Sequence, residues 1–337
     1  MTFASPADFR VALADLCVPD EGAIAEARAR QAELTKPAGS LGRLEDLAVF
    51  IAGWQGDPRP RIGRARTAIF AGNHGMTVHG VSAFPASVTA QMVANFEAGG
   101  AAINALSGAA GLELEVTALD LDTPTADFTI APAMTEAECL AALNAGAAVV
   151  ASDLDLLTVG EMGIGNSTAA AALCLRAFGG TAAEWIGPGT GVDAEGIARK
   201  TEVVERARAF HADGPADAFE TLRRVGGREI AAIAGAVLHA RQLGIPVVLD
   251  GFISSAAVAP LAADNVEITD HCIAGHVSAE PGHVRLLARL DLDPLLELGM
   301  RLGEGSGGAL AVNLIRSALA AHNQMATFAE AQVAAKL

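Results

Sequence analysis

The sequence predicts an α/β protein with a Rossmann-like, three-layer arrangement, in which helices cover both faces of a parallel sheet. Short apolar runs recur along the chain, and most of them stop at a Gly-rich or polar turn. Ala-rich stretches with helical spacing lie between them, an alternation typical of parallel βαβ units. We expect the strands within six segments: 67–75, 112–122, 154–163, 183–191, 245–252 and 268–278.

Both ends of the chain are expected to be helical. Residues 21–34 have helical spacing, Lys36 and Pro37 interrupt it, and a second helix follows with Ser40 as its N-cap. The pattern is wholly helical again from about residue 284 onward. We therefore predict an α/β catalytic domain with a small helical subdomain packed on it. The boundaries we expect are 60–285 for the catalytic domain, and 1–59 with 286–337 for the subdomain.

Composition narrows the possible functions of this chain of 337 residues. It carries 23 basic and 39 acidic residues, a net charge of −16, which opposes binding to nucleic acid or to an anionic membrane. No uncharged apolar run reaches membrane-spanning length, and the N-terminus lacks the pattern of a signal peptide. The four scattered cysteines form no C-x-x-C pair and fit a reducing cytosol, so we expect a cytoplasmic protein. They are Cys17, Cys139, Cys174 and Cys272.

The stretch GEMGIGNST, residues 160–168, is expected to bind a phosphate where a strand gives way to a helix. Its glycines let backbone N–H groups approach an anion, and the helix N-terminus adds free amides and a positive dipole end. It matches neither the P-loop nor a strict G-x-G-x-x-G, and the alternative is a tight turn capped by Ser167. The expected phosphate ligands here are Gly163, Gly165, Asn166, Ser167 and Thr168.

Two further Gly-rich turns accompany this stretch. GPGTG, residues 187–191, places Gly189 at another predicted strand exit, and Lys200 follows as a cation for the phosphate; the alternative is a plain turn and a solvated lysine. In MRLGEGSGGALAV, residues 300–312, Glu304 stands between two glycines before a helix. If apolar neighbours enclose it, its pKa should rise and suit it to proton abstraction. The alternative is that Glu304 only favours the helix dipole.

Histidines invite a metal site, but their spacing does not support one. His74 and His79 could combine with Asp250, but no pair shows the i, i+4 spacing of H-E-x-x-H, and no cysteine cluster is present. We expect no metal, and we expect these side chains to cap turns or contact a substrate. The remaining histidines considered are His271, His276 and His283.

Eight segments, in this order, resemble one enzyme family over nearly the whole chain. They are KPAGSLGRLEDLA (36–48), NHGMTVHGVSAFPASVTAQM (73–92), GEMGIGNSTAAAAL (160–173), ARK (198–200), VGGREIAAIAGAVLHAR (225–241), PVVLDGFISSAA (246–257), GHVSAEPGH (275–283) and MRLGEGSGGALA (300–311). The chain is similar in them to the nicotinate-nucleotide–dimethylbenzimidazole phosphoribosyltransferases.

This resemblance implies a reaction and the residues that carry it. The 5-phosphoribosyl group passes from nicotinate mononucleotide to 5,6-dimethylbenzimidazole, which gives α-ribazole 5′-phosphate and nicotinate during cobalamin biosynthesis. Glu304 falls on the family's base, Glu161 on its second acidic position and Lys200 on its phosphate-site lysine. A carboxylate such as Glu161 can stabilise positive charge at C1′. The resemblance further implies a homodimer and a reaction without metal or cofactor.

Some positions depart from the family pattern and concern the choice of base. Asn73 stands where many relatives have Asp, Phe84 where some have Ser, and Gly165 where some have Ala. We expect an apolar slot for a flat bicyclic base, although its residues could equally be core. Apolar contacts discriminate poorly between bases, so unsubstituted benzimidazole should also be accepted. The slot residues are Phe84, Met92, Met162 and Leu302.

Two other functions compete with this prediction. A metal-assisted phosphatase or hydrolase could use the histidines together with Asp250, and it would lose activity in excess chelator. A non-catalytic nucleotide-binding module could use the glycine loops alone, and it would have no need of Glu304.

Overall fold

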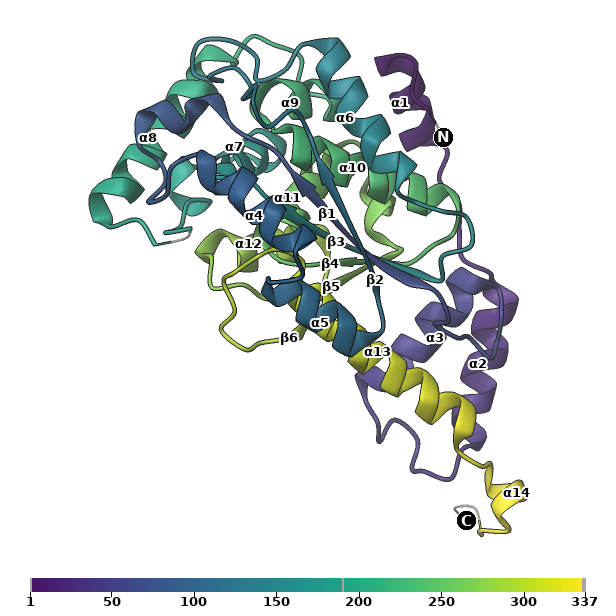
Figure 1. Cartoon of the computed structure of the whole chain (residues 1–337). Helices are drawn as coiled ribbons and strands as arrows, with labels where there is room; N and C mark the ends of the chain where they lie inside the picture. Colours follow the sequence, from purple (N-terminus) through teal and green to yellow (C-terminus); the bar gives the residue numbers. More distant parts are fainter. Residues whose placement is uncertain (1, 190, 335–337) are drawn as a thin grey trace.

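A computed structural model of the chain, which describes residues 2–189 and 191–334, contains a six-stranded sheet in the order β2-β1-β3-β4-β5-β6 (Figure 1). Every pair of neighbouring strands is parallel, so the predicted α/β class is confirmed. The strands are β1 (Ala65–Ala71), β2 (Glu113–Ala118), β3 (Leu156–Met162), β4 (Val247–Leu249), β5 (Cys272–His276) and β6 (Pro294–Leu296).

Two strand predictions need correction. Residues 183–189 form no strand; a 3-10 turn, η2 (Ala182–Glu184), precedes a loop in which Pro188 has no N–H to donate to a ladder. The apolar side chain of Trp185 is buried by packing and not by strand pairing. Conversely, residues from 284 onward are not wholly helical, because β6 joins the edge of the sheet. Its Pro294 is the first residue of this edge strand, where proline is tolerated.

Helices cover both faces of the sheet because strand side chains alternate between them. Leu157 and Val159 belong to the core on one face, whereas Leu156 belongs to the core on the other. The first face is covered mainly by α6 (Glu136–Ala148), α7 (Asn166–Phe178), α10 (Arg228–Gln242) and α11 (Phe252–Asp264). The second face is covered by α3 (Arg43–Gln55), α4 (Ser87–Glu97), α5 (Ala102–Ala110) and α13 (Ser306–Gln324).

The helices at the two ends of the chain do not all pack in the same part of the molecule. α2 (Glu21–Glu33) packs on α3, which packs on α13, so N- and C-terminal helices do lie together as expected (Figure 1). α1 (Pro6–Ala14), however, packs on α9 (Ala218–Val225) and α10 at a different part of the molecule. The division at residues 60 and 285 therefore stays a prediction.

The helix after Lys36 and Pro37 begins later than predicted. α3 starts at Arg43 with Gly42 as its N-cap, and Ser40 makes no capping bond to it. Instead, Glu45 accepts a hydrogen bond from the Leu41 N–H and pairs with the buried Lys36 at 2.8 Å. This ion pair fixes the loop that the sequence pattern attributed to a simple cap.

Several shorter elements complete the chain. The helices are α8 (Ala194–Phe210), α12 (Pro281–Leu290) and α14 (Phe328–Ala331), and the 3-10 turns are η1 (Gly75–His79) and η3 (Val266–Thr269). No helix in the described part of the chain combines the length and apolar character that a bilayer crossing requires. Cys17 is exposed, the other three cysteines are buried, and all four are free thiols.

The strand order creates a crevice between β1 and β3. The chain leaves β1 toward β2 on one side, and β3 then lies on the other side of β1. Loops that follow two such strands run in opposite directions, and ligands of open α/β sheets bind at this point, beyond the carboxyl ends of the strands. The GEMG stretch begins on β3 at this point.

The contact between α6 and α10 gives a test of the packing. A Cβ atom on Gly235 would collide with the carbonyl oxygen of Leu143, and one on Gly146 with that of Ala232. Gly235→Ala should therefore destabilise the protein by about 1–3 kcal/mol, because the helices must move apart. The measurement is the free energy of unfolding in urea. Gly108→Ala in α5 is the control, since open space surrounds that position; equal effects of the two variants would contradict this account.

Candidate active site

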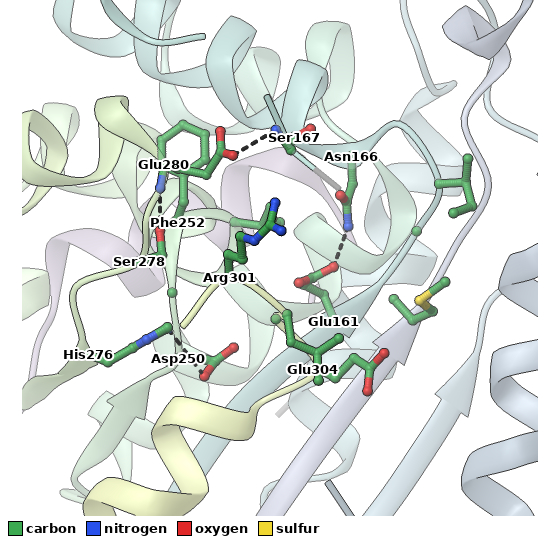
Figure 2. A pocket seen from close by; sticks show the side chains of 18 residues that line it. Glu161, Asn166, Ser167, Asp250, Phe252, His276, Ser278, Glu280, Arg301 and Glu304 are labelled. Atoms are coloured by element: carbon green, nitrogen blue, oxygen red, sulfur yellow. Dashed lines mark hydrogen bonds and ion pairs between the residues drawn. The ribbon is translucent and has the colours of Figure 1, made fainter. Parts of the chain in front are cut away.

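A pocket opens at the carboxyl ends of β3, β4 and β5, beside the segment that leads into α13 (Figure 2). Its wall combines acidic, basic and apolar side chains. The described residues that line it are Glu161, Met162, Gly163, Ile164, Asn166, Ser167, Gly189, Asp250, Gly251, Phe252, Ile253, His276, Ser278, Glu280, Arg301, Leu302, Gly303 and Glu304.

Two glycine motifs interlock at the floor of this pocket. A Cβ atom on Gly160 would collide with the backbone nitrogen of Gly305, so the end of β3 lies directly against the turn before α13. A Cβ atom on Gly303 would come within 2.5 Å of the Glu161 Oε1. Glycine at these positions therefore allows Glu161 and Glu304, far apart in sequence, to share one pocket.

The turn before α13 holds an uncommon backbone conformation. Gly303, Glu304 and Gly305 have φ angles of +78°, +59° and +75°, three left-handed residues in succession. Such a conformation costs a residue with a side chain about 1–3 kcal/mol, so it persists only where the surrounding structure imposes it. The conformation places the Glu304 carboxylate in the pocket wall, with the residue only 7% exposed.

Asp250, which follows β4, fixes this turn from below. Its Oδ2 accepts a hydrogen bond from the Gly305 N–H at 3.1 Å, and its Oδ1 accepts one from the Gly308 N–H at 2.9 Å. These are free amides at the N-terminus of α13, so the Asp250 carboxylate interacts favourably with the positive end of the helix dipole. Asp250 therefore already provides the negative charge near this dipole that the alternative role assigns to Glu304.

Burial and like charge shift the acids of the pocket. Burial, followed by the charge of Asp250, raises the pKa of Glu304 to about 7. The same two causes, in the same order, raise the pKa of Glu161 to about 8, although an Asn166 hydrogen bond opposes the shift. A carboxyl group with a pKa near the working pH is suited to general acid–base catalysis.

The predicted phosphate ligands are only partly brought together. Gly163, Asn166, Ser167 and Gly189 line the pocket, and α7 begins at Asn166 after the N-cap Gly165, near the predicted Ser167. Asn166 donates to Glu161. The helix N-cap has no side-chain bond, so Ser167 does not cap it.

Three of the predicted ligands lie behind the pocket wall. Gly165 and Thr168 are not among the lining residues, and Thr168 is fully buried. Lys200 is also buried, and burial lowers the pKa of its ammonium group. Its Nζ donates to Ser167 Oγ at 3.1 Å and to the Gly187 carbonyl at 2.7 Å, so it reaches the site from behind Ser167.

The predicted base slot is divided in the same way. Met162 and Leu302 line the pocket, as expected. Phe84 is 49% exposed on the segment before α4 and does not line it, and Met92 on α4 packs against the hydrophobic core. Sequence order alone could not separate these positions, because the four residues come from three different segments.

The histidines lie in separate surroundings, apart from His276 and His283, whose ring centroids are 6.4 Å apart. His74 pairs with buried Glu229 at 2.6 Å, and His79 pairs with Asp127 at 2.7 Å. His271 contacts the Val237 carbonyl, and His283 contacts Ser278 and Ser255. His276 alone lines the pocket, 4.0 Å from Asp250. Within residues 2–189 and 191–334, no three His, Cys, Asp or Glu side chains form a group that could hold a metal ion.

Sequence reasoning missed several pocket residues. Arg301 directly precedes Leu302 in the MRLGEG motif, and Ser278 and Glu280 belong to the SAEPGH segment. Phe252 and Ile253 follow Asp250 at the start of α11 and add apolar wall. Each lies within a segment that had been singled out, so proximity in sequence to a polar strand exit was the available signal.

The fold and the pocket define an α/β protein whose site, at the carboxyl ends of parallel strands, combines several carboxylates with Gly-rich turns. A family model described as "Phosphoribosyltransferase" matches residues 17–333. A relative from Novosphingobium aromaticivorans, named nicotinate-nucleotide–dimethylbenzimidazole phosphoribosyltransferase, is 74% identical over 98% of both chains. One of the same name from Ruegeria pomeroyi is 60% identical over 97% of both.

A solved structure agrees with these sequence comparisons. The crystal structure of CobT from Thermus thermophilus is similar with a TM-score of 0.87 and 41% identity, over 94% of this chain and all of that one. The chain therefore belongs to the nicotinate-nucleotide–dimethylbenzimidazole phosphoribosyltransferase family, as its motifs predicted.

The raised pKa of Glu304 makes a prediction about stability. The folded state holds a proton up to about pH 7, whereas an unfolded glutamate releases it near the ordinary pKa of 4.5. The group therefore costs the protein stability as pH rises from 4.5 to 7. Glu304→Gln removes this pH-dependent loss. The free energy of unfolding of the variant minus that of the original protein should therefore be larger above pH 7 than at pH 4.5, by on the order of 1 kcal/mol.

Thermal unfolding at pH 4.5 and pH 8 measures this effect. Glu297→Gln, at an exposed position in the same segment, is the control for the loss of one glutamate. A Glu304→Gln difference that does not change with pH would contradict the shift.

Proposed function

We propose that this protein transfers the 5-phosphoribosyl group of nicotinate mononucleotide to 5,6-dimethylbenzimidazole, a step in cobalamin biosynthesis. The products are α-ribazole 5′-phosphate and nicotinate. The observation that carries the proposal is the placement of Glu304, buried beside Asp250 in the pocket wall, in a family whose relatives bear this enzyme's name. Purified protein incubated with both substrates should form ribazole phosphate, as detected by mass spectrometry.

The reaction needs one base and no acid. One ring nitrogen of the benzimidazole attacks C1′ while Glu304 removes the proton from the other. The bond between C1′ and the pyridinium nitrogen breaks, and its electron pair neutralises the positive ring, so the leaving nicotinate requires no proton. The N–H becomes strongly acidic only as the new bond forms, so the base acts mainly in the transition state.

Glu161 faces the same reacting centre from the end of β3. Its raised pKa means that it takes up a proton readily. The cationic pyridinium ribose would favour its charged form on binding, since an opposite charge lowers the pKa of a carboxyl group. We assign Glu161 the stabilisation of positive charge at C1′, with Asn166 orienting it.

The two ends of the donor would then occupy the two sides of the pocket. The phosphate is held by the start of α7, residues 187–189 and Lys200, where backbone amides and one buried cation are available. The acceptor base lies against Met162 and Leu302, with Phe252 and Ile253 as additional apolar wall. We further propose that the protein acts as a homodimer in the cytoplasm, without metal or cofactor.

Replacement of Glu304 tests the assignment of the base. Glu304→Gln keeps the shape and loses the proton acceptor, so kcat should fall about a hundred- to ten-thousandfold while the Kd of each substrate stays nearly unchanged. Glu161→Gln should cost less, and Glu297→Gln serves as the control. Steady-state kinetics with titration calorimetry measures both quantities. Retention of more than about a tenth of kcat by Glu304→Gln would make Glu161 the leading candidate.

Replacement of Lys200 tests the phosphate end. Lys200→Ala removes an interaction that the ground state and the transition state share, so the KM for nicotinate mononucleotide should rise more than kcat falls. The KM for the benzimidazole should not change. The matched control is Arg199→Ala, the neighbouring and more exposed cation of α8. An unchanged KM for the nucleotide in Lys200→Ala would remove Lys200 from the phosphate site.

A further inference from the structure

Three donor groups meet where the proposed phosphate would bind. A Cβ atom on Gly189 would lie 2.9 Å from Ser167 Oγ and 3.4 Å from Lys200 Nζ, so the 187–189 turn packs against both. Ser167 is in the first turn of α7, and Lys200 lies on α8. An anion at this position would receive a backbone N–H, a hydroxyl and a buried ammonium group.

A carboxylate of the protein already uses this place. Glu280 Oε1 accepts a hydrogen bond from the Gly189 N–H at 2.7 Å, and the dashed contact is visible in Figure 2. Its Oε2 lies against the Cα of Gly187, where a Cβ would collide with it. Glu280 is only 7% exposed, and its Oε2 has no hydrogen-bond partner within the described residues.

The charges around Glu280 act in opposite directions. Burial raises the pKa of this carboxyl group, whereas Lys200 and Arg301 favour its charged form. Lys200 in turn is a buried cation for which Glu280 is the compensating charge. The carboxylate therefore accepts a hydrogen bond from the amide that a phosphate oxygen would use, and the charge of the same cation acts on it.

One N–H cannot serve two anions, and a phosphate beside a buried carboxylate would be repelled by it. We propose that Glu280 occupies the anion site of the pocket, and that the phosphate of the donor substrate must displace its carboxylate in order to bind. Glu280 is thereby a specificity-determining residue. The inference rests on the proposed function, because it takes residues 187–189 and Lys200 as the phosphate site.

The structure offers the displaced carboxylate another partner. Arg301 lines the same pocket between Glu280 and Glu161, and within residues 2–189 and 191–334 its side chain makes no hydrogen bond or ion pair (Figure 2). Glu280 is also the N-cap residue of α12, and it makes no side-chain bond to that helix. Its side chain can leave Gly189 without breaking a cap.

Displacement makes the site selective for strongly charged ligands. A dianionic phosphate monoester offers Lys200 more charge than the resident carboxylate does, whereas a nucleoside without phosphate offers nothing in exchange. Wild-type affinity for the mononucleotide is therefore reduced by the energy of displacing Glu280. The nucleoside leaves Glu280 in place and is not affected.

The test compares nicotinate mononucleotide with nicotinate riboside, which lacks only the phosphate. In titration calorimetry, Glu280→Gln should lower the Kd of the mononucleotide about tenfold and leave that of the riboside unchanged. Glu280→Asp retains the charge but is one methylene group shorter, which takes its carboxylate away from the Gly189 N–H. It should also bind the mononucleotide more tightly than the original protein. Thermal unfolding verifies that each variant is folded.

Other outcomes separate the possible failures. The control is Glu195→Gln on α8, whose side chain is 86% exposed and which removes the same charge; it should bind both ligands as the original protein does. A weaker mononucleotide complex in Glu280→Gln, or wild-type affinity in Glu280→Asp, would overturn the inference. If the original protein bound the mononucleotide and the riboside equally, the proposed phosphate site itself would fail.

Discussion

The contact between the end of β3 and the turn before α13 is the constraint on which the site depends. Gly160 lies against the backbone of Gly305, and Gly303 lies against the carboxylate of Glu161. A side chain at Gly160 would separate the strand from the turn, and a side chain at Gly303 would displace the carboxylate of Glu161. Because the backbones touch, the two catalytic candidates, Glu161 and Glu304, occupy one pocket at the carboxyl end of β3, although 143 positions separate them in the sequence.

Asp250 makes this contact rigid and also determines its chemistry. Its two oxygens hold amides on both sides of the first turn of α13, which stabilises the left-handed run that includes Glu304. Burial raises the pKa of Glu304 and of Glu161, and the charge of Asp250 adds to the shift of both groups. Asp250 thus fixes the geometry of the proposed base and contributes to its proton affinity, although several acids must then lie close together. Functional sites commonly retain such unfavourable arrangements.

The sequence predicted the fold class and singled out several of the residues that line the pocket, because both depend on local patterns. Apolar runs that end in Gly-rich turns located five of the six strands, and the motif around Glu304 indicated the base. The strand β6 was not predicted, because a strand of three residues that begins with proline is too short to show a periodic pattern. Phe84 and Met92 were assigned to the pocket because their segment belongs to the family pattern, but the path of the chain carries them elsewhere. The bond between Glu280 and Gly189 joins segments that are distant in sequence, so no local pattern could reveal it.

The central claim is that the interlocked glycine motifs hold Glu304 as a buried carboxyl group whose proton affinity suits a base near neutral pH. A direct measurement is the NMR titration of protein labelled with ¹³C at the glutamate carboxyl carbons, with the Glu304 signal assigned by its absence in Glu304→Gln. The account predicts a titration midpoint of about pH 7 for this signal. A midpoint near the ordinary glutamate value of about 4.3 would contradict it.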